Sequence, residues 1–240
     1  MAEKIILDKI PEEYMIKSLG KGASAECFLT SEGHAFKKFN STKDIDSFYN
    51  IFASKEYYKS DIFVFPHTFV FLGKEEPVNF VGYLMKYIDG VKLQDLESNI
   101  LIRDLMSAIR QIEIEMKRLT LQGLMFNDLN SRNILFQTIH TPRVVDTDLY
   151  EGTYNDMFGD MFKENIKELA ETIICSVVGY DELESEKMNR YIYQCGCYGM
   201  MLPSLLMSEL LDYAESTLGI KIETYGDYKN SMKLLRKHPY

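Results

Sequence analysis

The sequence predicts an α+β protein in which a β-rich N-terminal part is followed by a mainly helical C-terminal part. The first 90 or so residues are rich in aromatic and β-branched residues punctuated by glycine, a pattern typical of short strands and turns. From about residue 93, apolar residues recur every three or four positions, which is the spacing of amphipathic helices. We expect the chain to pass from one part to the other near Asp89-Gly90.

The N-terminal part is expected to form a mostly antiparallel sheet of about five strands that carries one helix. The stretch YMIKSLGKGASAECFLTSEGHAFKKF predicts three of these strands. A glycine-rich turn joins the first two, and the hairpin signal Ser31-Glu32-Gly33 joins the second and third. Residues 44–59 predict the helix, and FVFPHTFVFL and NFVGYLMKYI predict two further strands.

Apolar stripes predict the helices of the C-terminal part. The first amphipathic helix is marked by Leu101, Leu105, Ile109, Ile112, Met116 and Leu119. A helix buried within its lobe is marked by a broader apolar set, Ile166, Leu169, Ala170, Ile173, Ile174, Val177 and Val178. Pro203 opens another helix with Leu206, Leu210 and Ala214 on one face, and a last helix is expected over about 227–236.

Composition and charge exclude several classes of protein. The formal net charge of -9 argues against non-specific nucleic-acid binding, so we expect no nucleic-acid partner. No apolar run approaches the roughly 20 residues of a membrane span, and the charged start MAEKIILDKIPEEY does not resemble a signal peptide. The four cysteines lack the spacing of a zinc site or a disulfide scaffold, so we expect reduced thiols in a cytoplasmic protein.

Two stretches of the N-terminal part could handle a phosphate group. The stretch GKGASAEC, from Gly20 to Cys27, would let backbone N–H groups approach phosphate oxygens, although it also suits a simple β-turn. Lys37 and Lys38 point to opposite faces of a strand, so one of them is expected to point inward, where a lysine needs an anion. Glu56 on the predicted helix could pair with Lys37 or remain a surface charge.

A second group of polar residues lies in the stretch FNDLNSRNILF and just after it. Asp128 could accept the proton of a substrate hydroxyl, and the side-chain carbonyl of Asn133 is a hard ligand suited to Mg²⁺. Asp146 ends the short apolar stretch RVVD and could bridge a metal ion to phosphates. Taken singly, each of these residues also fits a turn or an exposed loop.

Taken together and in order, these segments resemble the protein-kinase superfamily over nearly the whole chain. LGKGASAEC resembles the glycine-rich loop, with Ala25 in the third glycine position and Cys27 in place of a valine. HAFK resembles the Val-Ala-Ile-Lys strand, YLMKYIDGVKLQDL the hinge, FNDLNSRN the catalytic loop, and NIKELAETIICSVVG the long buried helix, while VVDTD stands where Asp-Phe-Gly would be. The resemblance implies one bilobal kinase-like domain, with an N-lobe of residues 1–88 and a C-lobe of residues 89–240.

The resemblance also implies roles for particular residues, with ATP and Mg²⁺ as cofactors. Lys37, held by Glu56, would grip the α- and β-phosphates, and Asp128 would orient and deprotonate an acceptor hydroxyl. Asn133 and Asp146 would bind Mg²⁺. The other ATP-binding residues would be Gly20, Lys21, Gly22, Ala23, Ser24, Ala25, Cys27, Ala35, the gatekeeper Met85, Lys86, Tyr87, Ile88 and Leu135.

Several positions depart from the family pattern. Phe126 replaces a largely structural His and is expected to pack inward. Asn127 replaces the Arg that in the family grips an activation-loop phosphate, so control by that phosphate is not expected. Asn130 stands where serine/threonine kinases usually have a Lys, and Asp148 replaces the glycine of the metal motif, which leaves its role as a metal ligand open.

Three functions remain open at this point: a kinase acting on a protein hydroxyl, a small-molecule kinase, and an ATP-binding pseudokinase scaffold. Only eighteen residues, 147–164, separate Asp146 from Asn165, which resembles the shorter segment of aminoglycoside and choline kinases. The acids of this segment predict an acceptor that carries positive charge near its hydroxyl. They are Asp148, Glu151, Asp156, Asp160 and Glu164, against the single Lys163.

Overall fold

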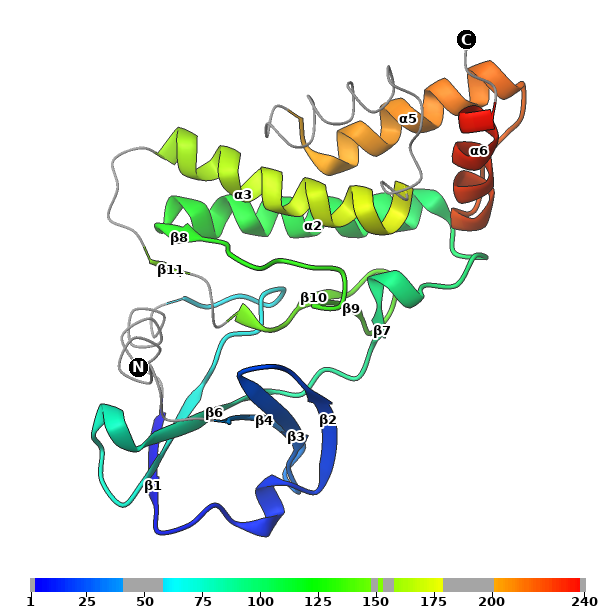
Figure 1. Ribbon diagram of the computed structural model, residues 1–240. Coiled ribbons are helices and arrows are strands. Elements are labelled where there is room, and N and C mark those ends of the chain that lie inside the picture. The colour runs from blue at the N-terminus through cyan, green and yellow to red at the C-terminus, as the bar shows by residue number, and fades with distance from the viewer. Residues whose placement is uncertain (1–2, 41–57, 148–150, 153–157, 179–200, 238–240) are drawn as a thin grey trace. The chain divides into compact units, whose positions relative to one another are not determined.

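The computed structural model in Figure 1 describes residues 3–40, 58–147, 151–152, 158–178 and 201–237. The chain divides into two compact units. The first contains Met1–Asp89 and Val145–Gly152, and the second contains Gly90–Val144 and Thr153–Tyr240. The division at Asp89 and Gly90 falls where the sequence predicts the change from strands to helices. The sequence does not predict that the segment after Val144 belongs with the first unit.

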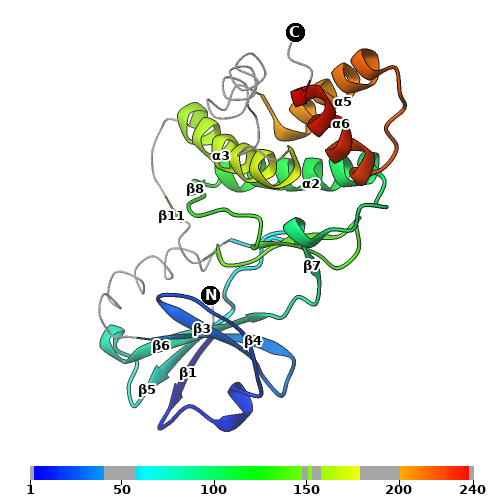
Figure 2. The same ribbon diagram turned by 45° about the vertical axis from the view of Figure 1, so that its right-hand side comes forward.

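The first unit is built on a six-stranded sheet with the order β1-β5-β6-β4-β3-β2. Five of these strands, β1, β3, β4, β5 and β6, are labelled in Figure 2. Its strands are β1 (Glu3–Leu7), β2 (Lys17–Lys21), β3 (Ala25–Leu29), β4 (His34–Phe39), β5 (Thr68–Leu72) and β6 (Phe80–Lys86). The 3-10 helices η1 (Glu12–Tyr14) and η2 (Pro77–Asn79) and the short strand β11 (Glu151–Gly152) complete the described elements of this unit.

The strand predictions are confirmed for β2 to β6, and the expectation of an antiparallel sheet is wrong at one edge. β1 is a sixth strand, and it pairs with β5 in parallel, with Glu3 opposite Thr68. No local hairpin signal marks such a strand, because its partner lies 65 positions later in the chain. The helix predicted over residues 44–59 lies almost entirely outside the described residues.

The hairpin between β3 and β4 follows the sequence prediction. Gly33 has a φ of 78°, a left-handed conformation that glycine adopts without steric cost, and its N–H donates to the carbonyl of Thr30 at 3.1 Å. On one face of the sheet, Phe36, Val70 and Leu84 form a buried core cluster. Burial of these apolar side chains is the main force that fixes the register of the three strands that carry them.

The second unit combines a small antiparallel sheet with four helices among its described residues. The sheet has the order β10-β9-β7 and consists of β7 (Val91–Lys92), β9 (Ile134–Phe136) and β10 (Pro142–Val144). The helices are α2 (Ile102–Leu121), α3 (Phe158–Ile173), α5 (Pro203–Leu218) and α6 (Tyr225–Lys237). The shorter elements are η3 (Leu93–Asp95), β8 (Leu124–Met125) and η5 (Ile174–Val178), a π-helical stretch that continues α3.

The predicted apolar stripes form the core between these helices, and α2 and α3 pack side by side (Figure 1). The buried stripe of α2 is Leu105, Ile109, Ile112, Met116 and Leu119, while Leu101 precedes the helix and is half-buried. The broad set on α3 and η5 is buried at Ile166, Leu169, Ala170, Ile173, Ile174 and Val177. Leu206, Leu210 and Ala214 of α5 are buried as predicted. Within the described part of the chain, no helix has the length and apolar character needed to cross a membrane.

A buried carboxylate on α2 caps the N-terminus of α5. Glu113 is only 3% exposed, and its two oxygens accept hydrogen bonds from the backbone N–H and the hydroxyl of Ser204, each at 2.6 Å. The first amides of a helix have no partner within the helix, so a carboxylate there satisfies them and complements the helix dipole. Burial raises the pKa of Glu113, against the lowering effects of the Ser204 hydrogen bonds and the Arg110 charge.

Candidate functional site

The most informative polar contact of the first unit joins two residues 109 positions apart in the sequence. The ammonium group of Lys37 donates a hydrogen bond to the carboxylate of Asp146, and the two form an ion pair. Only 13% of the Lys37 side chain is exposed, against 39% of that of Asp146. A lysine so far removed from water needs an anionic partner, and the prediction that one lysine of this strand points inward is confirmed for Lys37.

The pairing of the strands determines which residues surround Lys37. Residues directly opposite one another in a sheet point to the same face, and Lys37 lies opposite Cys27 of β3 and Tyr83 of β6. Ala35, two positions before Lys37, shares this face and lies opposite Met85. Cys27, Ala35, Lys37 and Met85, all predicted to bind ATP, therefore share one face of the sheet, and the core cluster occupies the other.

Asp146 is held in an uncommon backbone conformation. Its φ of 62° lies in the left-handed region, which is sparsely populated by residues other than glycine but is more accessible to Asp and Asn. The next residue, Thr147, is buried, and its hydroxyl donates to the carbonyl of Val64 at 3.0 Å. The ion pair to Lys37 and the anchored Thr147 therefore hold Asp146 from both sides.

The glycine-rich turn between β2 and β3 is closed by backbone hydrogen bonds and by a side chain that no sequence pattern singles out. The N–H of Gly22 donates to the carbonyl of Ala25 at 2.8 Å. The side-chain amide of Asn40 donates to the carbonyl of Ala23 at 3.2 Å. The backbone N–H of Asn40 donates to the carbonyl of Ser24 at 2.8 Å. Among the described residues, apart from the two chain neighbours of Gly20, no heavy atom lies within 4 Å of the position that a Cβ would take there, so this side of the backbone faces open space.

The segment predicted as the hinge follows directly from β6. Met85 and Ile88 are buried, Lys86 is exposed, and Tyr87 is half-buried. Burial raises the pKa of Tyr87, and the neighbouring negative charge of Asp89 adds to this effect. Glu56 and Asp148 lie outside the described residues, so the pairing of Lys37 with Glu56 stays a prediction.

The predicted catalytic loop lies in the second unit, between β8 and β9. Phe126 is 1% exposed, which confirms that it packs inward. Asp128 has a φ of 58°, again in the left-handed region. Asn130 organises the turn that follows, because its side-chain amide donates to the carbonyl of Asp128 at 3.3 Å and its side-chain oxygen accepts the N–H of Arg132 at 3.1 Å. The N–H of Asn133 donates to the carbonyl of Asn130 at 3.0 Å, and Asn133 is only 9% exposed.

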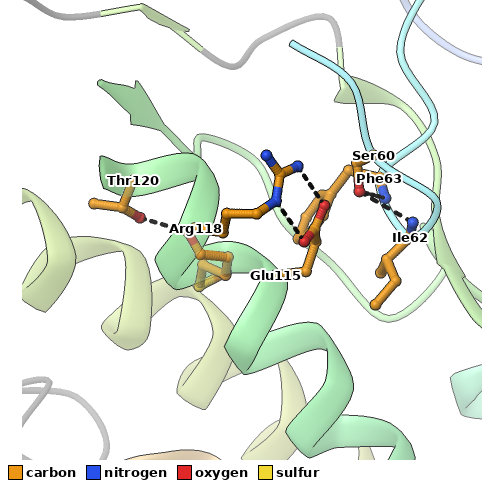
Figure 3. Close-up of polar contacts among 7 residues, drawn as sticks. Ser60, Ile62, Phe63, Glu115, Arg118 and Thr120 are labelled. Atoms are coloured by element: carbon orange, nitrogen blue, oxygen red, sulfur yellow. Dashed lines mark hydrogen bonds and ion pairs between the residues drawn. The ribbon is translucent and has the colours of Figure 1, made fainter. Parts of the chain in front are cut away.

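A fully buried amide on α3 anchors the start of this loop. The side-chain oxygen of Asn165 accepts the N–H of Phe126 at 2.8 Å, and its amide nitrogen donates to the carbonyl of Leu124 at 3.0 Å and to the hydroxyl of Thr120 at 2.8 Å. The Thr120 hydroxyl in turn donates to the carbonyl of Met116 at 2.8 Å. Thr120 is labelled in Figure 3. One side chain therefore ties α2, β8 and the loop to α3.

The predicted site residues fall into two groups, each within its own unit. Lys37 and Asp146 form a pair in the first unit, while Asp128 and Asn133 lie on one turn in the second, with Leu135 following in β9. Within the described ranges, no group of three or more His, Cys, Asp or Glu side chains could hold a metal ion. No protein-family model and no curated protein matches this chain. Its function is therefore inferred from the residues and their arrangement.

Proposed function

We propose that the protein is an ATP- and Mg²⁺-dependent phosphotransferase of protein-kinase type that transfers the γ-phosphoryl group of ATP to a hydroxyl of a protein. The observation that carries the proposal is the ion pair between Lys37 and Asp146. Phosphoryl transfer requires a cation on the phosphates and an acid on the metal, and the two must be neighbours because they act on the same phosphate groups. Ala35 and Met85 share the Lys37 face of the sheet and would contact the adenine.

The donor groups suit Mg²⁺. Asp146 would supply a carboxylate that is 39% exposed and so accessible to a ligand, and Asn133 would supply a side-chain carbonyl. Both are oxygen donors, and Mg²⁺ is commonly held by one or two protein groups together with substrate phosphates rather than by a cage of protein ligands. The metal ion would neutralise the charge that develops on the transferred group. Lys37 would exchange part of its interaction with Asp146 for one with the α- and β-phosphates.

The backbone supports a role for the two acids. Among the described residues, the only residues other than glycine with a positive φ are Asp128 and Asp146. Strained conformations of this kind cost of order 1–3 kcal/mol each and cluster at functional sites. Asp128 would accept the proton of the acceptor hydroxyl and orient the hydroxyl toward the γ-phosphate.

A second candidate is transfer to a small molecule. The observation that favours it is the length of the segment between Asp146 and Asn165, which at eighteen residues offers little platform for an extended peptide. Both candidates use the same groups for ATP and Mg²⁺, so they differ only in the acceptor.

Intact-mass measurement after incubation with Mg·ATP tests the proposal even though the acceptor is unidentified. We expect a gain of the mass of a phosphoryl group, either on the wild-type protein itself or on another protein that is included in the reaction as an acceptor. Lys37→Met and Asp128→Asn should abolish the gain. Lys38→Met is the matched control, because Lys38 lies next to Lys37 and points to the opposite face of the sheet. Equal transfer by wild type and Lys37→Met would refute the proposed role of this lysine.

Thermal unfolding separates binding from catalysis. A ligand at ten times its dissociation constant stabilises the folded state by roughly 1.4 kcal/mol, or about 3–6 °C in Tm for a chain of this size. Mg·ATP should produce this shift, and Asp146→Asn should remove its dependence on Mg²⁺. A shift without any phosphoryl transfer would identify an ATP-binding scaffold, and a protein that neither binds nor transfers would refute the kinase proposal.

A further inference from the structure

We propose that Thr172 on α3 is a positioning residue that holds the catalytic loop so that Asp128 keeps its left-handed conformation. The proposal rests on the function proposed above, in which Asp128 meets the acceptor hydroxyl. Thr172 does not touch the reacting groups. It would act through Leu129, the residue that follows Asp128.

The hydroxyl of Thr172 donates a hydrogen bond to the backbone carbonyl of Leu129 at 2.6 Å, and the contact is buried. Thr172 is 7% exposed and Leu129 is 5% exposed, so water does not compete for this bond. A threonine within a helix usually turns its hydroxyl back to the carbonyl one turn earlier. Here the Thr172 hydroxyl donates to the loop instead, so this hydrogen bond links α3 to the loop.

The other polar group of Leu129 also faces α3. A hydrogen bond from the backbone N–H of Leu129 favours the ionised form of the half-buried Glu168 carboxyl. Burial first, then the negative charges of Glu171 and Asp128, raise the pKa of Glu168, while Lys167 and the Leu129 hydrogen bond oppose this.

The spacing of the contacts explains how one helix can hold the loop on both sides of Asp128. Asn165, Glu168 and Thr172 are three and then four positions apart, so they lie on one face of α3. Asn165 holds the N–H of Phe126, two residues before Asp128, and Thr172 holds the carbonyl of Leu129, one residue after it. Relaxing the φ of Asp128 to a negative value would rotate the flanking peptide planes and break one of these buried bonds. The helix thus offsets the backbone strain at Asp128.

The test compares Thr172→Val with Thr172→Ser. Valine keeps the shape of threonine but leaves the Leu129 carbonyl without its donor, whereas serine keeps the donor. Because misplacement of a reacting group by about 1 Å can cost up to about 100-fold in rate, we expect Thr172→Val to lower kcat by about 10- to 100-fold. The KM for Mg·ATP should stay within about twofold, since the ATP-binding residues named above do not include Thr172, and Thr172→Ser should restore most of kcat.

A second readout does not depend on activity. Amide hydrogen exchange over residues 126–130 should speed up in Thr172→Val and remain at the wild-type rate in Thr172→Ser. Ser231→Ala is the matched control, because Ser231 is also buried in a helix of this unit but its hydroxyl bonds within α6, to the carbonyl of Asp227 at 2.8 Å. If Thr172→Val does not fold, Thr172→Ala, which also removes the donor to the Leu129 carbonyl, replaces it and is compared with the same Thr172→Ser variant.

The two readouts distinguish failure of this proposal from failure of the proposed function. A wild-type protein without any phosphoryl transfer would refute the function, and the exchange data alone would then decide whether α3 holds the loop. Wild-type exchange and an unchanged kcat in Thr172→Val would overturn the positioning role. Equal loss of kcat in Thr172→Val and Ser231→Ala would overturn it as well, because it would reflect general destabilisation.

Discussion

The cap that Glu113 places on α5 gives a stability prediction that is independent of any proposed function. We consider Glu113→Ala, which removes both acceptors of Ser204. A buried donor left without a partner costs about 1–3 kcal/mol, and two donors are affected, so we expect a loss of about 4 kcal/mol. A protein of this size loses about 2–4 °C in Tm per kcal/mol, which corresponds to a decrease of about 8–16 °C.

Glu113→Gln separates the hydrogen bonds from the charge. Glutamine keeps one acceptor at the helix N-terminus but exchanges a charge-assisted bond for a neutral one, which costs about 1 kcal/mol. It also removes a carboxylate whose burial is unfavourable. We therefore expect Glu113→Gln to lose much less stability than Glu113→Ala at neutral pH.

The raised pKa of Glu113 fixes the sign of the pH dependence. Its folded-state pKa lies above the ordinary value of 4.5, so the folded protein retains this proton to higher pH than the unfolded chain does. The contribution that this pKa shift of Glu113 makes to the stability of the folded protein is fully present below pH 4.5. It is lost as the pH rises through the raised folded-state pKa of Glu113. Relative to wild type, Glu113→Gln should gain stability as the pH rises across this range.

Differential scanning calorimetry or urea unfolding at several pH values measures these effects. Glu115→Ala is the matched control, because Glu115 lies on the same helix and pairs with Arg118 at 2.6 and 2.8 Å near the surface (Figure 3). Partly exposed pairs of this kind contribute about 0–1 kcal/mol. The reasoning would be refuted if Glu113→Ala cost no more than Glu115→Ala, or if the difference between wild type and Glu113→Gln did not vary with pH.

Three further predictions concern the candidate site. Gly82→Ala would place a Cβ 2.2 Å from the backbone oxygen of Lys37, so β4 must shift. We expect Tm to fall by the equivalent of about 1–3 kcal/mol and Mg·ATP binding to weaken. A variant that is destabilised but binds Mg·ATP normally would contradict this prediction. Because Asn127 cannot grip a phosphate as Arg would, protein treated with phosphatase should keep its full rate, and a large loss restored by rephosphorylation would show that another basic group does this work. If the acids of residues 147–164 attract a cationic acceptor, its second-order rate should fall as ionic strength rises from about 0.01 to 0.15 M, where the Debye length shrinks from about 30 to 8 Å. The double variant Asp160→Asn and Glu164→Gln should flatten that dependence, and a rate that is independent of salt would exclude such steering.

The sequence predicts most of the regular elements because their signals are local. Alternation and glycine turns predict β2 to β6, and the three-and-four spacing predicts α2 and α5. The start of α3 at Phe158 is not predicted, although Phe158, Met161 and Phe162 follow the apolar spacing of the helix, because Gly159 interrupts the pattern. β1 is not predicted either, because a short parallel strand depends on a partner far along the chain.

In the candidate site, too, local features are predicted from the sequence and long-range contacts are not. Lys37 and Asp146 can each be singled out from the residues around them, but their pairing depends on the fold. Asn40 and Thr172 hydrogen-bond to backbone groups of neighbouring loops, and such contacts leave no periodicity or motif in the sequence. Side chains that position a loop are therefore the part of a site that sequence patterns reveal least.

The parallel strand β1 also covers a strand that could otherwise pair with other copies of the protein. β5 reads Thr-Phe-Val-Phe-Leu, has no charged residue, and would be the sheet edge if β1 were absent. An uncharged apolar edge strand is a template for pairing between molecules. β1 covers this edge and presents the charged residues Glu3 and Lys4, with Lys4 tied to Glu75 by an ion pair at 2.8 Å. Because β5 follows β1 by some sixty residues, the covering strand is already synthesised when the hazardous one emerges, so the order of the two strands in the chain protects the protein during folding.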